Sequence, residues 1–450
     1  MNNHFSLTPP KIVEELDKFI VGQDAAKRSV AIALRNRWRR QQVAGSMKGE
    51  IMPNNIILIG PTGVGKTEIA RRISKLTGAP FIKVEASKFT EVGYVGRDVE
   101  SMVRELMNYS ISQVREQMVE EVQQSARAKA EQRVLDILLP PRKKSKTRDP
   151  EAESRYQRSR EKMMKKLVSG ALDDKEIEIE PEHNNLPIME IIPNPNLEML
   201  DIDISEMLSS FIPEKLNRRK LSTTVGLALK RFTESELNNL ISKEKMIETA
   251  RQNVEEKGII FIDEIDKIAT ADRGNSLDVS RSGVQRDLLP IVEGSKVPTK
   301  YGMIDTSHIL FIAAGAFSIA KPSDLIPELQ GRFPIRVELN SLNQSDFQRI
   351  LTEPENSLTK QYQAIFASEE VNLSFQTDAI IEIARYAALA NDKMEDIGAR
   401  RLHTIMNTLL DDFLFNMPSP ELKAVKISRK FVKERLAPVI ESEDLSRFIL

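Results

Sequence analysis

Residues 56–67 read IILIGPTGVGKT, and this stretch decides the fold of the chain. The apolar run 56–59 predicts a buried strand, a glycine-rich turn follows it, and residues 66–73 (KTEIARRI) predict the start of a helix. This order is the context of a phosphate-binding P-loop, in which glycines let main-chain N–H groups converge on phosphate beside the helix dipole. An ordinary glycine turn in a βα unit is the alternative. The residues expected to bind nucleotide are Gly60, Pro61, Thr62, Gly63, Val64, Gly65, Lys66 and Thr67.

Two acidic residues supply what hydrolysis needs beyond a P-loop. The run 259–262 (IIFI) predicts a second buried strand, which ends in Asp263 and Glu264. We expect Asp263 and the Thr67 hydroxyl to hold Mg²⁺, and Glu264 to act as general base toward the attacking water. Lys66 is expected to reach the β and γ phosphates of ATP. The alternative is an acidic junction between a strand and a surface loop.

The composition excludes several kinds of site. The 65 Lys and Arg residues balance 66 Asp and Glu residues to a net charge of −1, which offers no overall attraction to nucleic acid or anionic membranes. No cysteine is present and the four histidines lack metal-ligand spacing, so Mg²⁺ bound with nucleotide is the expected metal. The first residues carry no signal sequence, and no apolar run approaches the ~18 residues of a membrane helix. We expect a soluble, cytoplasmic protein of about three domains.

The distance between the two motifs indicates a large insertion, since Asp263 lies far downstream of the P-loop. Residues 97–139 contain no Gly or Pro and predict one long helix that leaves the core. Residues 142–166 are dense in charge and poor in large apolar side chains, which indicates a mobile or disordered excursion. Residues 227–257, again free of Gly and Pro, predict a second long helix that ends at Gly258.

These features predict an α/β fold. Its core is a parallel sheet flanked by helices, interrupted by a largely helical inserted domain and followed by a small, mainly helical C-terminal domain. The expected bounds are 1–109 and 246–339 for the core, 110–245 for the insertion and 340–450 for the C-terminal domain. The expected core strands are 56–59, 80–85, 259–262 and 308–314, and one strand is expected in the C-terminal domain at 424–428.

Seven segments together carry a family resemblance: VGQDAAKRSVAIALRNRWRR (21–40), GPTGVGKTEIARRI (60–73), EVGYVGRDVE (91–100), IIFIDEIDKI (259–268), GRFPIRVEL (331–339), GARRLH (398–403) and LSRFIL (445–450). With them the chain resembles the HslU (ClpY) family of AAA+ P-loop ATPases along its whole length. The resemblance implies a Mg²⁺-dependent ATPase that forms a homo-hexameric chaperone ring, unfolds tagged or unfolded proteins and feeds them to an HslV-like peptidase ring. No peptidase motif occurs in the chain itself, and neither a membrane nor nucleic acid is an expected partner.

The resemblance also gives roles to residues outside the P-loop. Ile20 and Val21, an apolar pair beside a glycine, are expected to lie against the adenine, unless they are ordinary core residues. The expected pore loop, which pushes on polypeptide, consists of Gly93, Tyr94, Val95 and Gly96. A glycine-flanked turn with Tyr94 in the core is the alternative.

Two arginines and the tail complete the expected site. Arg332 resembles the arginine finger, which reaches the γ-phosphate of an adjacent subunit. Arg400 resembles the sensor arginine of the C-terminal domain, with Arg401 as the alternative. The residues expected to dock into the peptidase, unless they fold back on their own domain, are Leu445, Phe448, Ile449 and Leu450.

The chain departs from many AAA+ proteins at the end of the predicted strand 308–314. Those proteins carry Asn or Thr there, whereas residues 313–316 read AAGA. Glu264 is then expected to position water alone, or with a polar group from elsewhere. Two other functions stay open: a nucleic-acid motor, favoured by the basic segments 35–40 and 142–148, and a scaffold that binds ATP without turnover.

Overall fold

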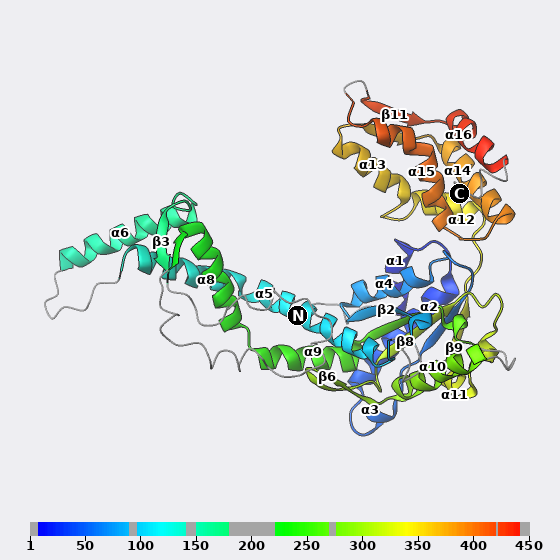
Figure 1. Ribbon diagram of the computed structural model, residues 1–450, viewed down its shortest axis with the longest axis horizontal. Coiled ribbons are helices and arrows are strands. Elements are labelled where there is room, and N and C mark those ends of the chain that lie inside the picture. The colour runs from blue at the N-terminus through cyan, green and yellow to red at the C-terminus, as the bar shows by residue number, and fades with distance from the viewer. Residues whose placement is uncertain are drawn as a thin grey trace. The chain divides into compact units, whose positions relative to one another are not determined.

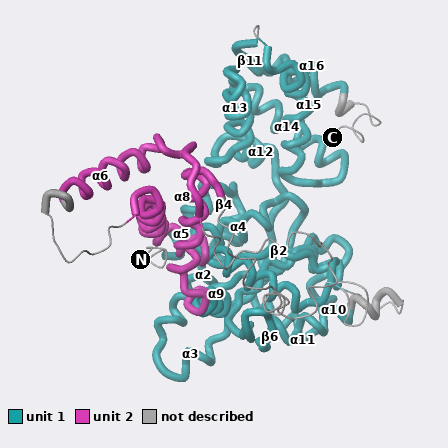
Figure 2. The backbone as a smooth tube through the Cα atoms, turned by 60° about the vertical axis from the view of Figure 1, so that its left-hand side comes forward, with its two compact units in different colours: residues 1–113, 247–450 teal, residues 114–246 magenta. Residues whose placement is uncertain are grey.

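The computed structural model describes residues 8–89, 97–140, 150–179, 221–269, 276–419 and 422–441. The chain divides into two compact units, one made of residues 1–113 with 247–450 and the other of residues 114–246 (Figure 2). The second unit therefore interrupts the first in sequence. Within the described ranges, no helix has both the length and the apolar character needed to cross a membrane.

A five-stranded parallel sheet forms the centre of the first unit, as the sequence predicts. Its order is β2-β5-β8-β1-β9, so the P-loop strand β1 lies between β8 and β9. The edge strand β9 is not among the expected strands; its residues alternate apolar and charged, a pattern typical of a half-buried strand, but the run is only four residues long. The strands are β1 (Ile56–Ile59), β2 (Phe81–Glu85), β5 (Ile259–Asp263), β8 (Leu310–Gly315) and β9 (Ile335–Glu338).

Helices bury the two faces of this sheet (Figure 1). Successive strand residues point to opposite faces. Accordingly, Ile56 and Leu58 join the core formed with helices α1, α2 and α4, whereas Ile57 points to the other face and is equally buried. The remaining elements of this part include a short antiparallel hairpin, β6–β7. Their bounds are α1 (Pro9–Asp17), α2 (Asp24–Gln42), α3 (Met47–Glu50), α4 (Lys66–Thr77), α5 (Ser101–Leu138), β6 (Lys296–Thr299), β7 (Gly302–Asp305), α10 (Ser276–Glu293) and α11 (Pro327–Arg332).

The C-terminal region of the first unit is helical, as predicted, and has its own apolar core. The predicted strand is present as β11, and it pairs in parallel with β10, which the sequence did not reveal. The elements are α12 (Gln344–Thr352), α13 (Leu358–Ser368), β10 (Asn372–Phe375), α14 (Thr377–Lys393), α15 (Arg400–Asn416), β11 (Ala424–Ile427) and α16 (Arg429–Glu441). We call residues 344–441 the C-terminal region.

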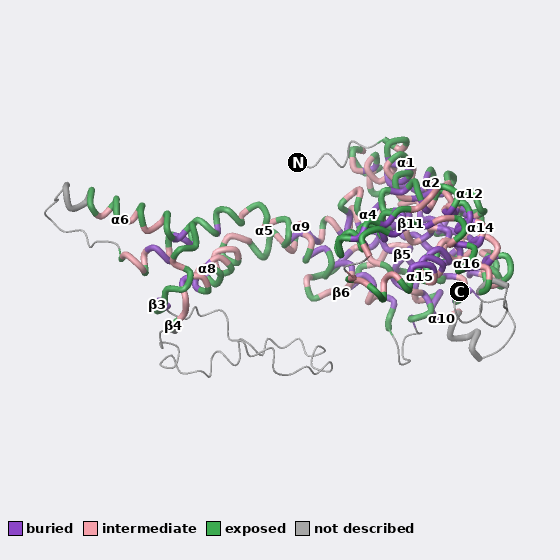
Figure 3. Tube along the Cα trace, turned by 90° about the horizontal axis from the view of Figure 1, so that it is seen from above, coloured by how far each residue is buried: buried purple, intermediate pink, exposed green. Residues whose placement is uncertain are grey.

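The second unit has a small core of its own, built from the later part of α5, the helices α6 and α8, and a two-stranded antiparallel sheet. Ala130, Val134, Leu167, Ile177 and Phe232 are buried there. Buried residues are sparse along α6, which Figure 3 shows as largely exposed. The elements are α6 (Pro150–Val168), β3 (Glu176–Ile179), β4 (Leu221–Thr224) and α8 (Val225–Leu240). Helix α9 (Lys243–Lys257) begins in the second unit and continues into the first, which resumes at residue 247.

The prediction of a disordered excursion at 142–166 is wrong for residues 150–166, which belong to helix α6. Two apolar contacts hold this charged helix. Leu167 is 2% exposed in the core of the second unit, with Met164 packed against that core. A polar contact is added by the Tyr156 hydroxyl, which donates a hydrogen bond to the Leu139 carbonyl oxygen at 3.4 Å. Charge density alone therefore hides the apolar stripe that anchors α6.

The prediction of one long helix at 227–257 is also wrong, because the chain breaks between α8 and α9. Ser242 lies at the break, and its Oγ accepts a hydrogen bond from the Lys245 amide at 3.3 Å. A serine that caps a new helix competes with continuation of the old one. The absence of Gly and Pro is therefore a poor guide here.

Candidate nucleotide site

The P-loop joins β1 to α4 at the carboxyl edge of the sheet. Gly60, Gly63 and Gly65 have positive φ (150°, 76° and 103°), a conformation that side-chain-bearing residues rarely adopt. Space also forbids side chains, because a Cβ on Gly63 would lie 2.0 Å from the Ile397 carbonyl oxygen. A Cβ on Gly60 would lie 2.6 Å from the Leu339 carbonyl oxygen. The glycines therefore let two later segments of the chain approach the loop.

Lys66 begins α4, and its Nζ donates to the Gly60 carbonyl oxygen at 2.5 Å. Its side chain is buried. This burial lowers the pKa of Lys66, and the positive charge of Arg400 acts in the same direction. The carboxylates of Asp263 and Asp266 oppose the shift. A partly desolvated ammonium group favours an anionic partner, and a triphosphate is such a partner.

Asp263 ends β5 beside the first turn of α4. Its Oδ2 lies 3.5 Å from the Thr67 Oγ1, so the two residues expected to hold Mg²⁺ lie together. Hydroxyl and carboxylate oxygens are ligands that suit Mg²⁺. The same Oδ2 lies 2.7 Å from the Lys83 Nζ on β2. Lys83 was not among the residues predicted from the sequence; its one signal there is a lysine inside the otherwise strand-like run PFIKVE.

Glu264 follows β5 and is exposed. Its Oε2 accepts a hydrogen bond from the Ser87 Oγ at 3.0 Å, and its own amide donates to the Asp263 Oδ1 at 3.1 Å. Its φ of 56° is one of four positive values for non-glycine residues in the described part of the chain. Two of the others, at Gln23 and Phe317, also lie at this edge of the sheet. Strained backbone of this kind concentrates at functional sites.

Ile20 and Val21 lie in the turn before α2 and are 5% and 7% exposed. The Ile20 Cγ2 lies 3.8 Å from where a Cβ of Gly65 would stand, so this side chain packs against the P-loop. Ile20 also belongs to the core beneath α1 and α2. The two interpretations of Ile20, core residue and neighbour of the nucleotide loop, are therefore compatible. The buried Lys27 holds the turn by donating to the Ile20 carbonyl oxygen at 3.2 Å.

Gln23 ties this turn to the chain that leads into the C-terminal region. Its side chain donates to the Asn340 carbonyl oxygen at 2.9 Å and accepts from the Asn340 amide at 3.1 Å. The amide of the preceding residue, Leu339, donates to the Ile59 carbonyl oxygen at 2.7 Å. These contacts were not foreseen, because the paired residues are 317 positions apart for Gln23 and Asn340.

Arg400 and Arg401 are neighbours with different environments. The Ala399 amide donates to the Gly63 carbonyl oxygen at 3.0 Å, which brings the start of α15 to the P-loop. Arg400 is exposed there, and its charge acts on Lys66 as described above. Arg401 is 3% exposed, and its Nε donates to the Asn391 Oδ1 at 3.1 Å. Of the two arginines, Arg400 is the one whose charge acts on the P-loop lysine, and Arg401 is a buried member of the C-terminal region.

Arg332 ends α11, and its guanidinium pairs with Glu293 on α10 through hydrogen bonds of 2.8 and 3.0 Å. Its side chain is 42% exposed. Its carbonyl oxygen accepts from the Asn55 amide group at 3.0 Å, and the Asn55 Oδ1 accepts from the Phe311 amide. The hydrogen bonds of the Asn55 side chain therefore hold the backbone of Arg332, whereas its guanidinium is half exposed.

Two predicted elements lie outside the described residues. These are the pore loop Gly93, Tyr94, Val95 and Gly96, and the docking tail Leu445, Phe448, Ile449 and Leu450.

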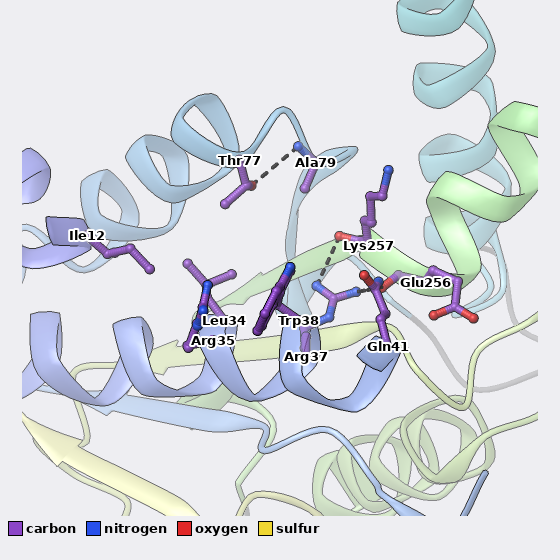
Figure 4. A pocket seen from close by; sticks show the side chains of 10 residues that line it. All are labelled: Ile12, Leu34, Arg35, Arg37, Trp38, Gln41, Thr77, Ala79, Glu256 and Lys257. Carbon is purple, nitrogen blue, oxygen red and sulfur yellow. Dashed lines mark hydrogen bonds between the residues drawn. The ribbon is translucent and has the colours of Figure 1, made fainter. Parts of the chain in front are cut away.

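The amino edge of the same sheet carries a different cluster (Figure 4). Arg37, mostly buried on α2, donates to the carbonyl oxygens of Glu256 (2.9 Å), Lys257 (3.0 Å) and His308 (3.1 Å). Burial lowers the pKa of Arg37 to about 9, which leaves it charged at neutral pH. Two of its acceptors are carbonyls at the C-terminal end of α9, where helix carbonyls lack partners of their own. Arg37 therefore acts as a cap.

The neighbouring arginines are engaged in a similar way. The Arg35 guanidinium lies 3.7 Å from the Trp38 ring centroid. Arg40 is 7% exposed, donates to the Lys48 carbonyl oxygen at 2.9 Å and pairs with Glu256 at 3.3 Å. The basic segment 35–40 is thus largely used inside the fold, which weakens its interpretation as a nucleic-acid surface.

Comparison with known families gives two matches. The family described as "ATPase family associated with various cellular activities (AAA)" matches residues 56–162, which include the P-loop. The family described as "AAA domain (Cdc48 subfamily)" matches residues 189–336, which include the Asp263–Glu264 pair. The first match contains strands β1 and β2 and the second contains β5 and β8, and both matches extend into the residues of the second unit.

Comparison with single proteins is more specific. The chain is similar to proteins that carry the name "ATP-dependent protease ATPase subunit HslU". The relative from Persephonella marina is 51% identical over 99% of both chains, and that from Oleidesulfovibrio alaskensis is also 51% identical over 99% of both. The relative from Thermosipho africanus is 50% identical over the full length of both. With half of all residues shared from end to end, the chain belongs to the HslU family of AAA ATPases.

Proposed function

We propose that this chain is the ATP-driven unfoldase subunit of a two-part protease and that it hydrolyses ATP at the P-loop site. The observation that carries the proposal is the meeting of Lys66, Thr67, Asp263 and Glu264 at one edge of the sheet. Its relatives are named as the ATPase subunits of an ATP-dependent protease. An ATPase of this kind supplies the force for unfolding and leaves peptide cleavage to a separate, HslV-like peptidase.

Each residue at the edge has a proposed task. The loop amides of residues 60–67 and the Lys66 ammonium bind the triphosphate, and Ile20 and Val21 lie against the base. Glu264 takes the proton of the attacking water. Mg²⁺, when bound, would neutralise phosphate charge, and the oxygens of Thr67 and Asp263 suit it as ligands. Arg400 contributes positive charge to the phosphates from the C-terminal region.

A homo-hexameric ring is the proposed active form. Within one subunit the Arg332 guanidinium pairs with Glu293 and is half exposed, which leaves it accessible to a neighbouring subunit. We propose that Arg332 acts on ATP bound by that neighbour, as an arginine finger. The number of six subunits rests on the family resemblance.

The remaining proposals rest on the sequence. Residues 93–96 form the pore loop that grips unfolded or tagged protein substrates, and the tail docks into the peptidase. The core domain combines residues 1–109 and 246–339, the inserted domain is 110–245, and 340–450 is the C-terminal domain. The cytoplasm is the proposed location.

The proposal is tested by degradation of a folded, tagged protein with purified components. We expect degradation only when ATP, this chain and an HslV-type peptidase ring are all present. Tyr94→Ala should abolish degradation while ATP hydrolysis continues, because the pore grip is lost and the ATP site is intact. Tyr109→Ala, which removes a 47% exposed tyrosine from α5, serves as the matched control.

Two outcomes would contradict the proposal. Degradation by this chain without the peptidase would place cleavage here. ATP hydrolysis stimulated by DNA, and indifferent to protein substrate, would favour a nucleic-acid motor instead.

A further inference from the structure

The end of strand β8 lacks the polar side chain that many AAA+ proteins carry there. Gly315 ends the strand and is followed by Ala316. The position is central, because the Gly315 carbonyl oxygen accepts a hydrogen bond from the Gly60 amide at 3.2 Å. Residue 315 is therefore one hydrogen bond away from the P-loop.

The space that a side chain at position 315 would need is filled by the carboxylate of Asp266. A Cβ built on Gly315 would lie 2.7 Å from the Asp266 Oδ1 and 2.8 Å from the Phe317 ring. The other carboxylate oxygen accepts from the Phe317 amide at 3.3 Å. Asp266 lies in the 3₁₀ turn Ile265–Lys267 that directly follows Glu264. The absence of a side chain at position 315 thus leaves room for an acidic residue from the turn after the neighbouring strand β5.

The carboxylate is also near enough to the P-loop for its charge to act there. Asp266 raises the pKa of Lys66, against the larger lowering effect of burial. Among the groups that raise this pKa, Asp263 comes first and Asp266 second. Asp266 therefore follows the general base proposed above by two residues, and its charge acts on the P-loop lysine, although no sequence motif pointed to it.

We propose that Asp266 is a positioning residue for ATP hydrolysis, which supplies the polar group missing from the end of β8. Its carboxylate accepts a hydrogen bond from the water that Glu264 activates, and the contacts with Gly315 and Phe317 hold it in place. The inference rests on the proposed function, since it requires hydrolysis at this edge of the sheet. What is needed at this point is a hydrogen-bonding group, and Asn supplies one on the strand itself in many AAA+ proteins.

The first test compares Asp266→Ala with Asp266→Asn. The alanine variant should lower kcat for ATP by about 10²-fold, the usual cost of misplacing a reacting group by about 1 Å. The dissociation constant for a fluorescent ATP analogue, measured directly, should stay within about twofold, since Asp266 is not among the proposed phosphate ligands. The asparagine variant keeps an acceptor for the Phe317 amide and for water, so it should retain kcat within about threefold.

Asp346→Ala is the matched control, because Asp346 is also partly buried and accepts a main-chain N–H, from Asn343 at 3.0 Å, but lies in the C-terminal region. It should leave kcat unchanged. Melting temperatures of all variants, with and without nucleotide, separate loss of positioning from loss of folding.

The second test moves the polar group to the strand. Gly315→Asn alone should impair hydrolysis, because the new side chain collides with the Asp266 carboxylate. The double variant Asp266→Ala, Gly315→Asn removes the collision with the carboxylate, so that the Phe317 ring is the neighbour that must still shift, and it restores a hydrogen-bonding group at the same place. Its kcat should exceed that of Asp266→Ala by about tenfold or more, which is the effect of one regained hydrogen bond of about 1.4 kcal/mol.

Several results would overturn the inference. These are a normal kcat for Asp266→Ala, an asparagine variant as slow as the alanine variant, or no recovery in the double variant when its melting temperature equals that of wild type. Glu264→Gln separates this failure from failure of the proposed function. If Glu264→Gln stops hydrolysis and Asp266→Ala does not, only the role of Asp266 is lost. If Glu264→Gln hydrolyses ATP normally, the proposed function of the site fails as well.

Discussion

The two edges of the central sheet are completed in different ways. At the amino edge, the Arg37 guanidinium donates hydrogen bonds to carbonyl oxygens of α9 and of the segment before β8. Its donors and these acceptors are therefore paired within the fold. At the carboxyl edge, Glu264 and Phe317 hold left-handed backbone, and the Lys66 ammonium is turned toward its own loop carbonyls. One edge is closed by internal partners. The other keeps strain and charge that suit an external ligand.

The comparison teaches where substitutions should affect function and where they should affect stability. A buried donor whose acceptors are all main-chain carbonyls stabilises the fold, because its loss leaves those carbonyls without partners. A charge held near glycines of positive φ is available to a ligand. Variants at the carboxyl edge should therefore change nucleotide binding or turnover, and variants at the amino edge should change the free energy of unfolding.

The largest effect is expected for Lys66→Thr. The variant removes the buried ammonium of the P-loop, so the dissociation constant for ATP should rise by about 10²-fold or more, which corresponds to ~3 kcal/mol for a charge-assisted contact. Titration with a fluorescent ATP analogue measures it. Lys75→Thr removes an exposed lysine from the same helix and should leave the affinity unchanged. If Lys66→Thr bound ATP with unchanged affinity, the carboxyl edge of the sheet would not be the nucleotide site.

A comparable effect on stability is expected for Arg37→Met at the other edge. Methionine keeps much of the side-chain length but donates no hydrogen bond, so the carbonyl oxygens of Lys257 and His308 lose the Arg37 donor, while that of Glu256 keeps a longer hydrogen bond from Gln41 at 3.4 Å. The free energy of unfolding should fall by about 3 kcal/mol. Urea denaturation measures the change. The exposed Arg39 on the same helix provides the control Arg39→Met. If Arg37→Met instead weakened ATP binding at full stability, the amino edge would not be purely structural.

A smaller effect separates the two neighbouring arginines. Arg400→Ala should lower kcat for ATP by about tenfold, the effect of ~1.4 kcal/mol of lost charge stabilisation, with an unchanged melting temperature. Arg401→Ala should instead lower the melting temperature, because it leaves Asn391 and the Glu395 carbonyl oxygen without their buried donor. ATPase assays and thermal melts on the same preparations measure both. The reverse pattern would make Arg401 the residue that acts on phosphate.

The smallest effect is expected for Arg35→Ala. The variant removes the stacking on Trp38, a contact worth about 0.5–1 kcal/mol at a partly exposed site. Urea denaturation should show a loss of this size, with ATP affinity and turnover unchanged. If the free energy of unfolding fell as much as in Arg37→Met, the stability of the amino edge would depend on the whole arginine segment and not on the Arg37 guanidinium alone.

The parts of the molecule that the sequence predicted are those encoded in short stretches. The P-loop glycines, β1 and β5 are each readable within a dozen residues. The acceptors of Arg37, by contrast, lie 219 to 271 residues further along the chain, so no local pattern indicates them. Lys83 and Asp266 were missed for the same reason, since only the strand order β2-β5-β8 brings them to the P-loop edge.

The errors in the inserted unit have another cause. The charged helix α6 and the break at Ser242 depend on single residues, Leu167 buried in a small core and a hydroxyl that caps α9. Composition averaged over a segment does not register one such residue. Helix α6 and the start of α9 could therefore not be predicted, because a small apolar core and a helix cap each depend on too few residues.

Helix α2 connects the two edges. Gln23, directly before its first turn, forms two hydrogen bonds with the main chain of Asn340. Arg37, toward its C-terminal end, donates to the His308 carbonyl oxygen. Fourteen residues of unbroken helix between them span about 21 Å. Hydrogen bonds hold the helix near both of these residues. A movement of the C-terminal region that displaces Asn340 should therefore also displace the C-terminal end of α9.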